Sequence, residues 1–185
     1  SVTLFGQANA KRAQSVGAAF FTESPAFGKP TPTVEDFSAV GCTPILFDSG
    51  GTRLAEPDIR QKPDIVAPDG GNTTFFGRDI AIDTDQFPNF FGTSAAAPNA
   101  AAVAALLLEA VPGASPTDIY QALQTSALDL DDPNTPGFDV GFDAASGFGL
   151  IQADRALLTL LNRQTPLPSP ILVGTDQADT LIGTA

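Results

Sequence analysis

The segment from Ala95 to Leu108 constrains the fold more than any other part of the chain. Apart from Pro98 and Asn99, it contains only alanine, valine and leucine. Apolar residues would therefore cover every side of a helix formed here, which is typical of a helix buried all round rather than of an amphipathic surface helix. Pro112 and Gly113 mark its end. We expect this segment to form a central helix around which the rest of the domain packs.

Short apolar runs before this helix indicate strands, which places the chain in the α/β class. The most compact run is Asp64-Ile65-Val66-Ala67, stopped by Pro68 and by Gly70-Gly71. The other strand candidates are Val2 to Phe5, Val16 to Phe21, Phe37 to Val40 and Pro44 to Phe47. Gly50-Gly51 predicts a turn, and residues 72–91 are expected to be a loop with one or two short strands.

Two further helices are expected after the central one. Ser115 is suited to be an N-cap, Pro116 to fill the first helical position, and Asp118 to complete a capping box. The helix that starts there would run to about Ser126. Apolar residues at helical spacing predict a third helix from Ile151 to Asn162.

The character of the chain changes near residue 165. Residues 165–173 are rich in proline and predict a stiff, extended linker. Residues 174–185 differ from everything before them, with repeated glycine, threonine and aspartate. We therefore divide the chain into a folded part (1–164), a linker (165–173) and a separate tail (174–185). Because the sequence lacks methionine and starts at Ser1, we expect an interior piece of a longer product.

The charge balance and the missing histidine exclude several classes of function. A net charge of −12 repels phosphate backbones, so nucleic-acid binding is not expected. No apolar run approaches the roughly 20 residues that span a bilayer, so no membrane partner is expected either. The chain contains no histidine at all. A histidine-dependent catalytic triad or a histidine-bearing zinc site is therefore excluded within this chain.

Ser94 is a candidate nucleophile because it lies where a loop meets the central helix. A hydroxyl at a helix N-terminus faces unpaired backbone N–H groups and the positive end of the helix dipole. The same groups can stabilise an oxyanion that develops on a neighbouring acyl carbon, and Gly92 leaves room for a substrate backbone. The alternative is that Ser94 or Thr93 is an ordinary N-cap.

The segment Gly92-Thr93-Ser94-Ala95-Ala96-Ala97-Pro98 resembles the nucleophile motif of the subtilisin-like serine proteases, Gly-Thr-Ser-x-Ala-x-Pro, at every fixed position. Four other segments resemble landmarks of the same family, in the family's order. They are Ser15-Val16-Gly17-Ala18, Phe37-Ser38-Ala39-Val40-Gly41, Lys62-Pro63-Asp64-Ile65-Val66-Ala67-Pro68, and Gly147-Phe148-Gly149-Leu150-Ile151 followed by Ala153. The resemblance spans about residues 13–158.

This resemblance implies a fold, an activity and a set of partners. The chain would be the C-terminal portion of a subtilisin-like three-layer α/β fold with a parallel sheet and a buried central helix. Ser94 would be the acylated nucleophile of a serine endopeptidase, whereas the family's triad Asp and His lie upstream of this region. The chain alone is therefore expected to be inactive. Its expected partners are a protein or peptide substrate and the N-terminal half of the same protease domain.

Two asparagines depart from the family pattern. The second oxyanion donor of the family is an Asn side chain that should also lie upstream. Asn9 is the only nearby candidate, but its surroundings do not match the family's Asn-Gly context, so it is predicted to be a loop residue. Asn99 stands where many family members carry a histidine that is not the catalytic base. That change alone does not argue for inactivity.

Calcium is the one cofactor that the sequence suggests. An acidic loop supplies candidate oxygen ligands at Asp129, Asp131, Asp132, Asp139 and Asp143. A solvated loop is the simpler interpretation there, because no EF-hand spacing is present. The tail from Gly174 to Gly183 resembles the opening of a calcium-binding nonapeptide repeat of RTX (haemolysin-type) secreted proteins. Asp179 would then be a calcium ligand in a complete repeat array, and the parent protein would be secreted and extracellular.

An alternative function of a different class stays open. The chain could belong to a catalytically silent, secreted, calcium-associated or adhesive module that retains the subtilase scaffold. An Asp-x-Gly motif and a His-Gly motif upstream would favour the enzyme, and substitutions at those positions would favour the silent module.

Overall fold

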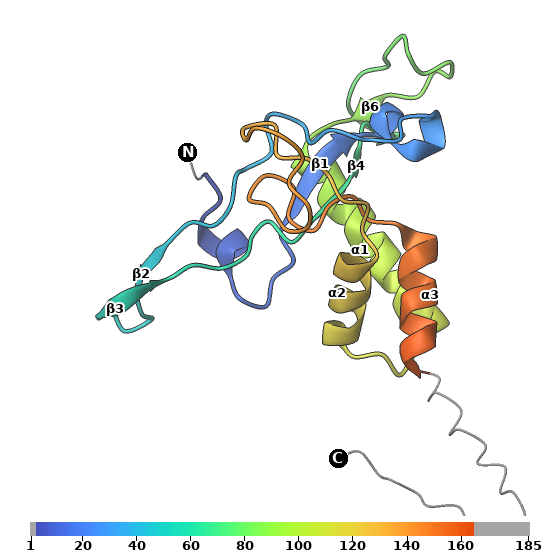
Figure 1. Cartoon of the computed structure of the whole chain (residues 1–185). Helices are drawn as coiled ribbons and strands as arrows, with labels where there is room; N and C mark the ends of the chain where they lie inside the picture. Colours follow the sequence, from blue (N-terminus) through green and yellow to red (C-terminus); the bar gives the residue numbers. More distant parts are fainter. Residues whose placement is uncertain (1–2, 165–185) are drawn as a thin grey trace, which may run out of the picture.

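The computed structural model describes residues 3–164 of the chain. A small parallel sheet lies between a layer of helices and an irregular loop, and two hairpins project from this core (Figure 1). The predicted linker and tail, and Asp179 with them, lie outside the described residues.

The central sheet pairs β1 (Val16–Phe20) and β4 (Ile65–Asp69) in parallel along their whole length. Successive side chains of a strand point to opposite faces, and the burial of these strands follows that rule. Ala18, Ile65 and Ala67 belong to a hydrophobic cluster on one face, whereas Ala19 and Val66 belong to a second cluster on the other. The sheet is therefore covered on both faces, as parallel sheets usually are.

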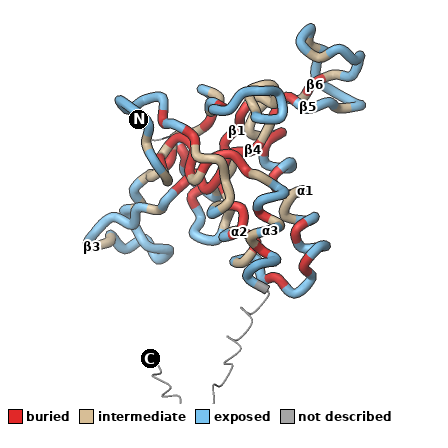
Figure 2. Tube along the Cα trace, turned by 45° about the vertical axis from the view of Figure 1, so that its right-hand side comes forward, coloured by how far each residue is buried: buried red, intermediate tan, exposed pale blue. Residues whose placement is uncertain are grey.

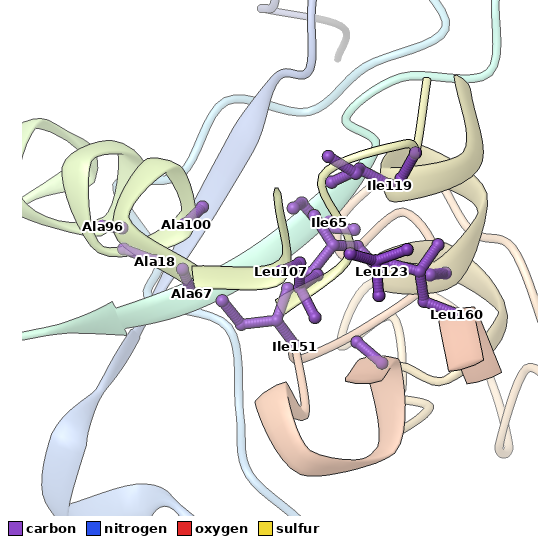
Figure 3. Close-up of a cluster of buried hydrophobic side chains, with 14 residues drawn as sticks. Ala18, Ile65, Ala67, Ala96, Ala100, Leu107, Ile119, Leu123, Ile151 and Leu160 are labelled. Atoms are coloured by element: carbon purple, nitrogen blue, oxygen red, sulfur yellow. The ribbon is translucent and has the colours of Figure 1, made fainter. Parts of the chain in front are cut away.

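Three helices cover the first face: α1 (Thr93–Ala110), α2 (Pro116–Thr125) and α3 (Ala153–Gln164). Small side chains on both sides let α1 lie close to the strands, and Figure 3 shows Ala96 and Ala100 beside the alanines of the sheet. Larger side chains fill the space between the three helices. They are Leu107, Ile119, Leu123, Ile151 and Leu160.

The irregular segment 128–150 covers the second face. Leu130 and Leu150 pack there against Ala19 and Val66. The segment is tied to the sheet by backbone hydrogen bonds, since the Val66 N–H donates to Gly149 O (2.8 Å) and the Ile151 N–H donates to Val66 O (3.0 Å).

A buried ion pair fixes the start of β4 to the start of β1. Lys62 Nζ lies 2.6 Å from Asp64 Oδ2, and both side chains are almost fully buried. The same carboxylate oxygen accepts hydrogen bonds from Ser15 N–H (2.7 Å) and Ser15 Oγ–H (3.0 Å). Gln124 Nε2 donates to the other oxygen at 3.3 Å.

The outer edge of β1 is partly covered by the segment just before the first hairpin. Ser38 Oγ accepts the Ala18 N–H at 3.0 Å, and the Glu35 N–H donates to Ala18 O at 2.8 Å. This edge is therefore less open than a bare parallel strand would be.

Two hairpins extend away from the core, and Figure 2 shows them as largely exposed. One pairs β2 (Ile45–Phe47) with β3 (Arg53–Asp58), and the other pairs β5 (Gly71–Asn72) with β6 (Asn89–Phe90). Three short 3-10 turns complete the described elements: η1 (Gly6–Asn9), η2 (Phe21–Glu23) and η3 (Pro25–Phe27).

Most expected elements are confirmed. Strands form at 16–20 and 65–69, all three helices form, and 71–90 is a loop with two short strands. The capping box of α2 is present: Ser115 Oγ accepts the Asp118 N–H (3.2 Å), and Asp118 Oδ2 accepts the Ser115 N–H (2.9 Å). The Ser115 hydroxyl also donates to Asp118 Oδ2 at 2.6 Å. The hydrogen bonds that the Asp118 carboxylate accepts from this hydroxyl and from the Ser115 N–H lower its pKa.

Two strand predictions are wrong, and one strand was missed. Thr3 to Phe5 is not a strand, because Thr3 and Leu4 donate only to the single carbonyl of Val40. Residues 37–40 form no strand either, since Ser38 is used to bond the edge of β1. The strand at residues 53–58 was not predicted, because its sequence is charged and contains a proline.

The expectation that α1 is buried all round is also wrong for the part of the chain that the structure describes. Only Ala95, Ala96, Ala100 and Leu107 of its 18 residues are buried. Leu106 is 61% exposed, because no layer of residues 3–164 lies against that side of the helix. By length and composition alone, α1 could cross a membrane, with a mean hydropathy of 1.2. Its packing on β1 and β4 supports a core helix instead.

Candidate active site

Ser94 is the second residue of α1, and its side chain is exposed. The helix begins at Thr93 because Gly92 turns the chain with φ 99° and ψ 168°, a conformation that L-residues rarely adopt. Gly92 O then accepts the N–H groups of Ala95 (2.8 Å) and Ala96 (3.1 Å). The N–H of Ser94 lies in the first turn, where no acceptor exists within the helix. A hydroxyl and an unpaired N–H of one residue therefore lie together at the helix N-terminus.

Pro98 lies inside α1, one turn beyond Ser94. In a regular helix the N–H of residue 98 would bond to the carbonyl of residue 94, and proline has no N–H to donate. The sequence therefore frees the Ser94 carbonyl from the helix ladder as well as its N–H group.

Two side-chain hydrogen bonds fasten the start of α1 to the end of β4. The Gly92 N–H donates to Asp69 Oδ2 at 2.6 Å, and Asn99 Nδ2 donates to Pro68 O at 2.8 Å. Asn99, the departure noted in the sequence, thus has a structural use. Asp69 was missed as a site residue, although a carboxylate directly after a buried strand and before Gly70-Gly71 was a visible signal.

Asp69 is fully buried, and its Oδ1 has no hydrogen-bond partner in the described part of the chain. Burial raises the pKa of the Asp69 carboxyl above its usual value, while the hydrogen bond from Gly92 works in the opposite direction. Burial also raises the pKa of Glu35, and the nearby charge of Asp69 adds to that effect.

No general base accompanies Ser94 within residues 3–164, which contain no histidine and record no hydrogen bond to the Ser94 hydroxyl. Asn9 ends the turn η1 instead of lying in a loop, and its side chain is buried. Its side-chain Nδ2 donates to Thr43 O (3.2 Å), and its backbone carbonyl accepts from Arg60 Nη1 (2.7 Å). Asn9 therefore ties the N-terminal segment to the β2–β3 hairpin.

Two adjoining grooves run beside the first turns of α1. The first, of about 380 Å³, is lined on one side by Thr93 and Ala97 and on the other by residues 14–17. The second, of about 320 Å³, shares Gln14, Val16 and Ala97 with the first and continues along the alanines of α1. Gln14 Oε1 is buried without a hydrogen-bond partner among the described residues.

The acidic loop uses its carboxylates to hold its own backbone. Asp143 accepts the N–H groups of Ala145 and Ser146 at 2.7 Å each, and Asp129 accepts the Gly141 N–H at 2.8 Å. Over residues 3–164, no group of three or more metal-ligating acidic or cysteine side chains is arranged to hold an ion. These carboxylates therefore have a structural explanation that needs no metal.

Comparison with known proteins supports the family resemblance. A sequence profile of the Subtilase family matches residues 8–149. The subtilisin-like protease SBT1.4 of Arabidopsis thaliana is 32% identical over 143 residues, which are 69% of this chain and 17% of that protein. The halolysin-like extracellular serine protease Nep of Natrialba magadii is 31% identical over 113 residues, or 61% of this chain and 18% of that protein.

The fold agrees with that of a solved relative. Fervidolysin from Fervidobacterium pennivorans, a keratinolytic enzyme related to subtilisin, superposes with a TM-score of 0.54 at 24% identity, over 88% of this chain and 20% of that one. The chain spans less than a fifth of the length of the two curated relatives. Because the family profile covers most of its length and its fold is the subtilisin-like α/β fold, the chain belongs to the subtilase family.

Proposed function

We propose that this chain supplies the nucleophile of a serine endopeptidase site, with Ser94 as the residue acylated by the substrate. The observation that carries the proposal is the position of Ser94: exposed in the first turn of α1, directly after the left-handed turn at Gly92, within the Gly-Thr-Ser-x-Ala-x-Pro motif. Membership of the subtilase family supports the same role. The substrate class would be a protein or peptide.

In this proposal Ser94 Oγ attacks the scissile carbonyl carbon and the Ser94 N–H donates to the oxyanion that forms. A histidine of the upstream segment takes the hydroxyl proton and returns it to the leaving amine, and an upstream aspartate orients that histidine. A serine without such a base is a weak nucleophile. The isolated chain is therefore expected to turn over no casein or peptide substrate above background.

The N-terminal half of the protease domain is the proposed partner of this chain. Three features support its docking along α1: the uncovered part of the helix, the two adjoining grooves, and Gln14, which lines both grooves and whose buried Oε1 has no partner among the described residues. An apolar helix face of this kind favours association over a free monomer. We propose that the isolated chain either binds that half or self-associates. Light scattering that finds a compact, cooperatively unfolding monomer of 19.0 kDa would contradict this.

The nucleophile is tested by fluorophosphonate labelling of the protease that contains this chain together with its triad histidine. We expect one label on Ser94, absent in Ser94→Ala. Ser115 provides a matched control, because it is also a serine at a helix N-terminus but lies outside the motif. Ser115→Ala should leave the labelling intact. A folded protein that takes up no label, or takes it up at another residue, would favour a catalytically silent module.

We also propose that the parent protein is secreted and that the tail opens a calcium-binding RTX repeat in which Asp179 is a ligand. The sequence of the tail supports this, and the extracellular relative Nep is consistent with secretion. Calcium titration of the full-length parent, followed by calorimetry, should reveal sites that are lost on deleting everything after residue 173. Binding that survives the deletion would place the calcium elsewhere.

A further inference from the structure

The turn at Gly92, which precedes the proposed nucleophile Ser94 and is called the nucleophile turn below, is held by a side chain that has no part in the triad mechanism. Asp69, the last residue of β4, lies 23 positions before Gly92 in the chain and contacts it directly. The distance of 2.6 Å from the Gly92 nitrogen to Asp69 Oδ2 is short, as expected for a hydrogen bond accepted by a carboxylate.

Gly92 is the residue whose conformation sets the direction of Ser94. Its φ of 99° and ψ of 168° lie in a region that is open essentially only to glycine. Its carbonyl is already committed to the first turn of α1 through Ala95 and Ala96. Its N–H is the other polar group that can be fixed, and Asp69 fixes it. The two peptide units on either side of the Gly92 Cα are thus both restrained by hydrogen bonds.

Side-chain packing around this hydrogen bond also holds the Gly92 turn in place. Phe91, immediately before Gly92, contacts Phe20 at the end of β1, with ring centroids 5.7 Å apart. Gly70, immediately after Asp69, lies against the same ring: a Cβ there would come within 2.7 Å of Phe20. The ends of both strands and the nucleophile turn therefore form one packed unit.

Fold stability alone is a poor explanation for an aspartate at position 69, because the side chain there is buried. A fully buried carboxylate with one oxygen unpartnered among the described residues is unfavourable compared with an apolar side chain of similar size. The interaction that offsets this is directed at a single group, the Gly92 N–H. Resting on the proposed function of Ser94, we propose that Asp69 is a positioning residue that holds the Gly92 turn so that the Ser94 hydroxyl and N–H face the substrate carbonyl together.

The test compares Asp69→Ala with Asp69→Asn in the active protease that contains this chain. Asn keeps an oxygen acceptor for the Gly92 N–H, whereas Ala keeps none. Misplacing a catalytic group by about 1 Å can lower the rate on the order of 10²-fold. We expect Asp69→Ala to lower kcat and the rate of fluorophosphonate labelling by a factor of that order, with KM changed less than threefold. Asp69→Asn should restore kcat to within about tenfold of the parent.

Asp118→Ala is the matched control, because Asp118 also accepts a backbone N–H at a helix N-terminus, on α2. It should lower the melting temperature without lowering kcat per folded molecule. All rates are normalised to the folded fraction measured by differential scanning fluorimetry.

The outcomes separate the two proposals. A parent protein that takes no label on Ser94 refutes the proposed function. A labelled parent in which Asp69→Ala reacts as fast as Asp69→Asn refutes the positioning role alone. If Asp69→Ala does not fold, Asp69→Asn still decides: a loss of kcat as large as 10²-fold, in a folded protein, would mean that the charge rather than the hydrogen bond is required.

Discussion

Gly149 offers the sharpest test of how the family's closing Gly-x-Gly-Leu segment works. It is buried, with φ 103°, and a Cβ built on it would lie 2.0 Å from Leu128 O and 2.7 Å from Leu128 C. Leu128 and Leu150 exchange two backbone hydrogen bonds at this point, both of 2.8 Å. Gly149→Ala must therefore push two paired backbone segments apart. Those segments carry the loop that covers the second face of the sheet.

The size of the effect can be separated into two contributions. A left-handed backbone costs a non-glycine residue about 1–2 kcal/mol. Gly141, with φ 94° and nothing within 4 Å of a built Cβ, would show this contribution alone. Gly149→Ala adds the loss of up to two hydrogen bonds, each contributing about 0.5–1.5 kcal/mol. We expect the unfolding free energy to fall by about 1–2 kcal/mol in Gly141→Ala and by about 2–5 kcal/mol in Gly149→Ala.

Urea denaturation of the full-length protein measures both values, on a Ser94→Ala background that removes the proposed nucleophile. The midpoint should move while the slope of free energy against urea stays constant, because the surface exposed on unfolding is unchanged. Losses in Gly149→Ala and Gly141→Ala that agree within about 0.5 kcal/mol, the scatter typical of neutral surface changes, would refute the reasoning.

Two further predictions concern buried charges. Lys62→Met removes the partner of the buried Asp64 carboxylate, so the unfolding free energy should fall by about 3–5 kcal/mol. Lys29→Met, which breaks the more exposed pair with Glu23, should change it by about 0–1 kcal/mol. Urea melts that give equal losses would contradict this. Because burial raises the pKa of Asp69, the native state holds that proton more tightly than the unfolded state. The unfolding free energy of the parent should thus fall relative to that of Asp69→Asn as pH rises from about 4 through the raised pKa. Urea melts in which the difference between the two unfolding free energies does not change with pH would contradict this.

The family motifs from which the fold was predicted lie against one another in the structure, with their backbones in close contact. A Cβ on Gly41 would lie 1.5 Å from Lys62 O, and a Cβ on Gly147 would lie 2.4 Å from Pro63 O. Ser38 accepts the N–H of Ala18 in the neighbouring landmark. Only particular residue types satisfy such contacts, so each contact leaves a residue pattern that can be read without a structure.

The features that sequence reasoning missed lack such a pattern. The strand β3 (Arg53–Asp58) is exposed along most of its length, so no alternation of apolar and polar residues marks it. Its pairing with β2 depends instead on the turn in which Asp48 Oδ1 accepts the N–H groups of Gly50 and Thr52. For Asp69, the position after a buried strand was a signal of a polar site. Its contact with Gly92 leaves no residue pattern, because Gly92 is distant in sequence and contributes only a backbone N–H.

The packing of α1 within the described residues explains only some of its apolar side chains. Its alanines at 95, 96 and 100 are explained by close packing on β1 and β4. Leu106 and Leu108 are not, since they are 61% and 45% exposed. Full burial of a leucine side chain contributes roughly 1.5–3 kcal/mol to stability, and these two residues gain only part of it here. The composition of α1 therefore fits a helix with further cover. Leu108 continues the row of Ala97, Ala101 and Ala104 at helical spacing, beside the second groove where we place the N-terminal half of the domain, whereas Leu106 lies on a different side of the helix. The same docking would bring a base to Ser94, so completing the core and completing the active site would be a single event.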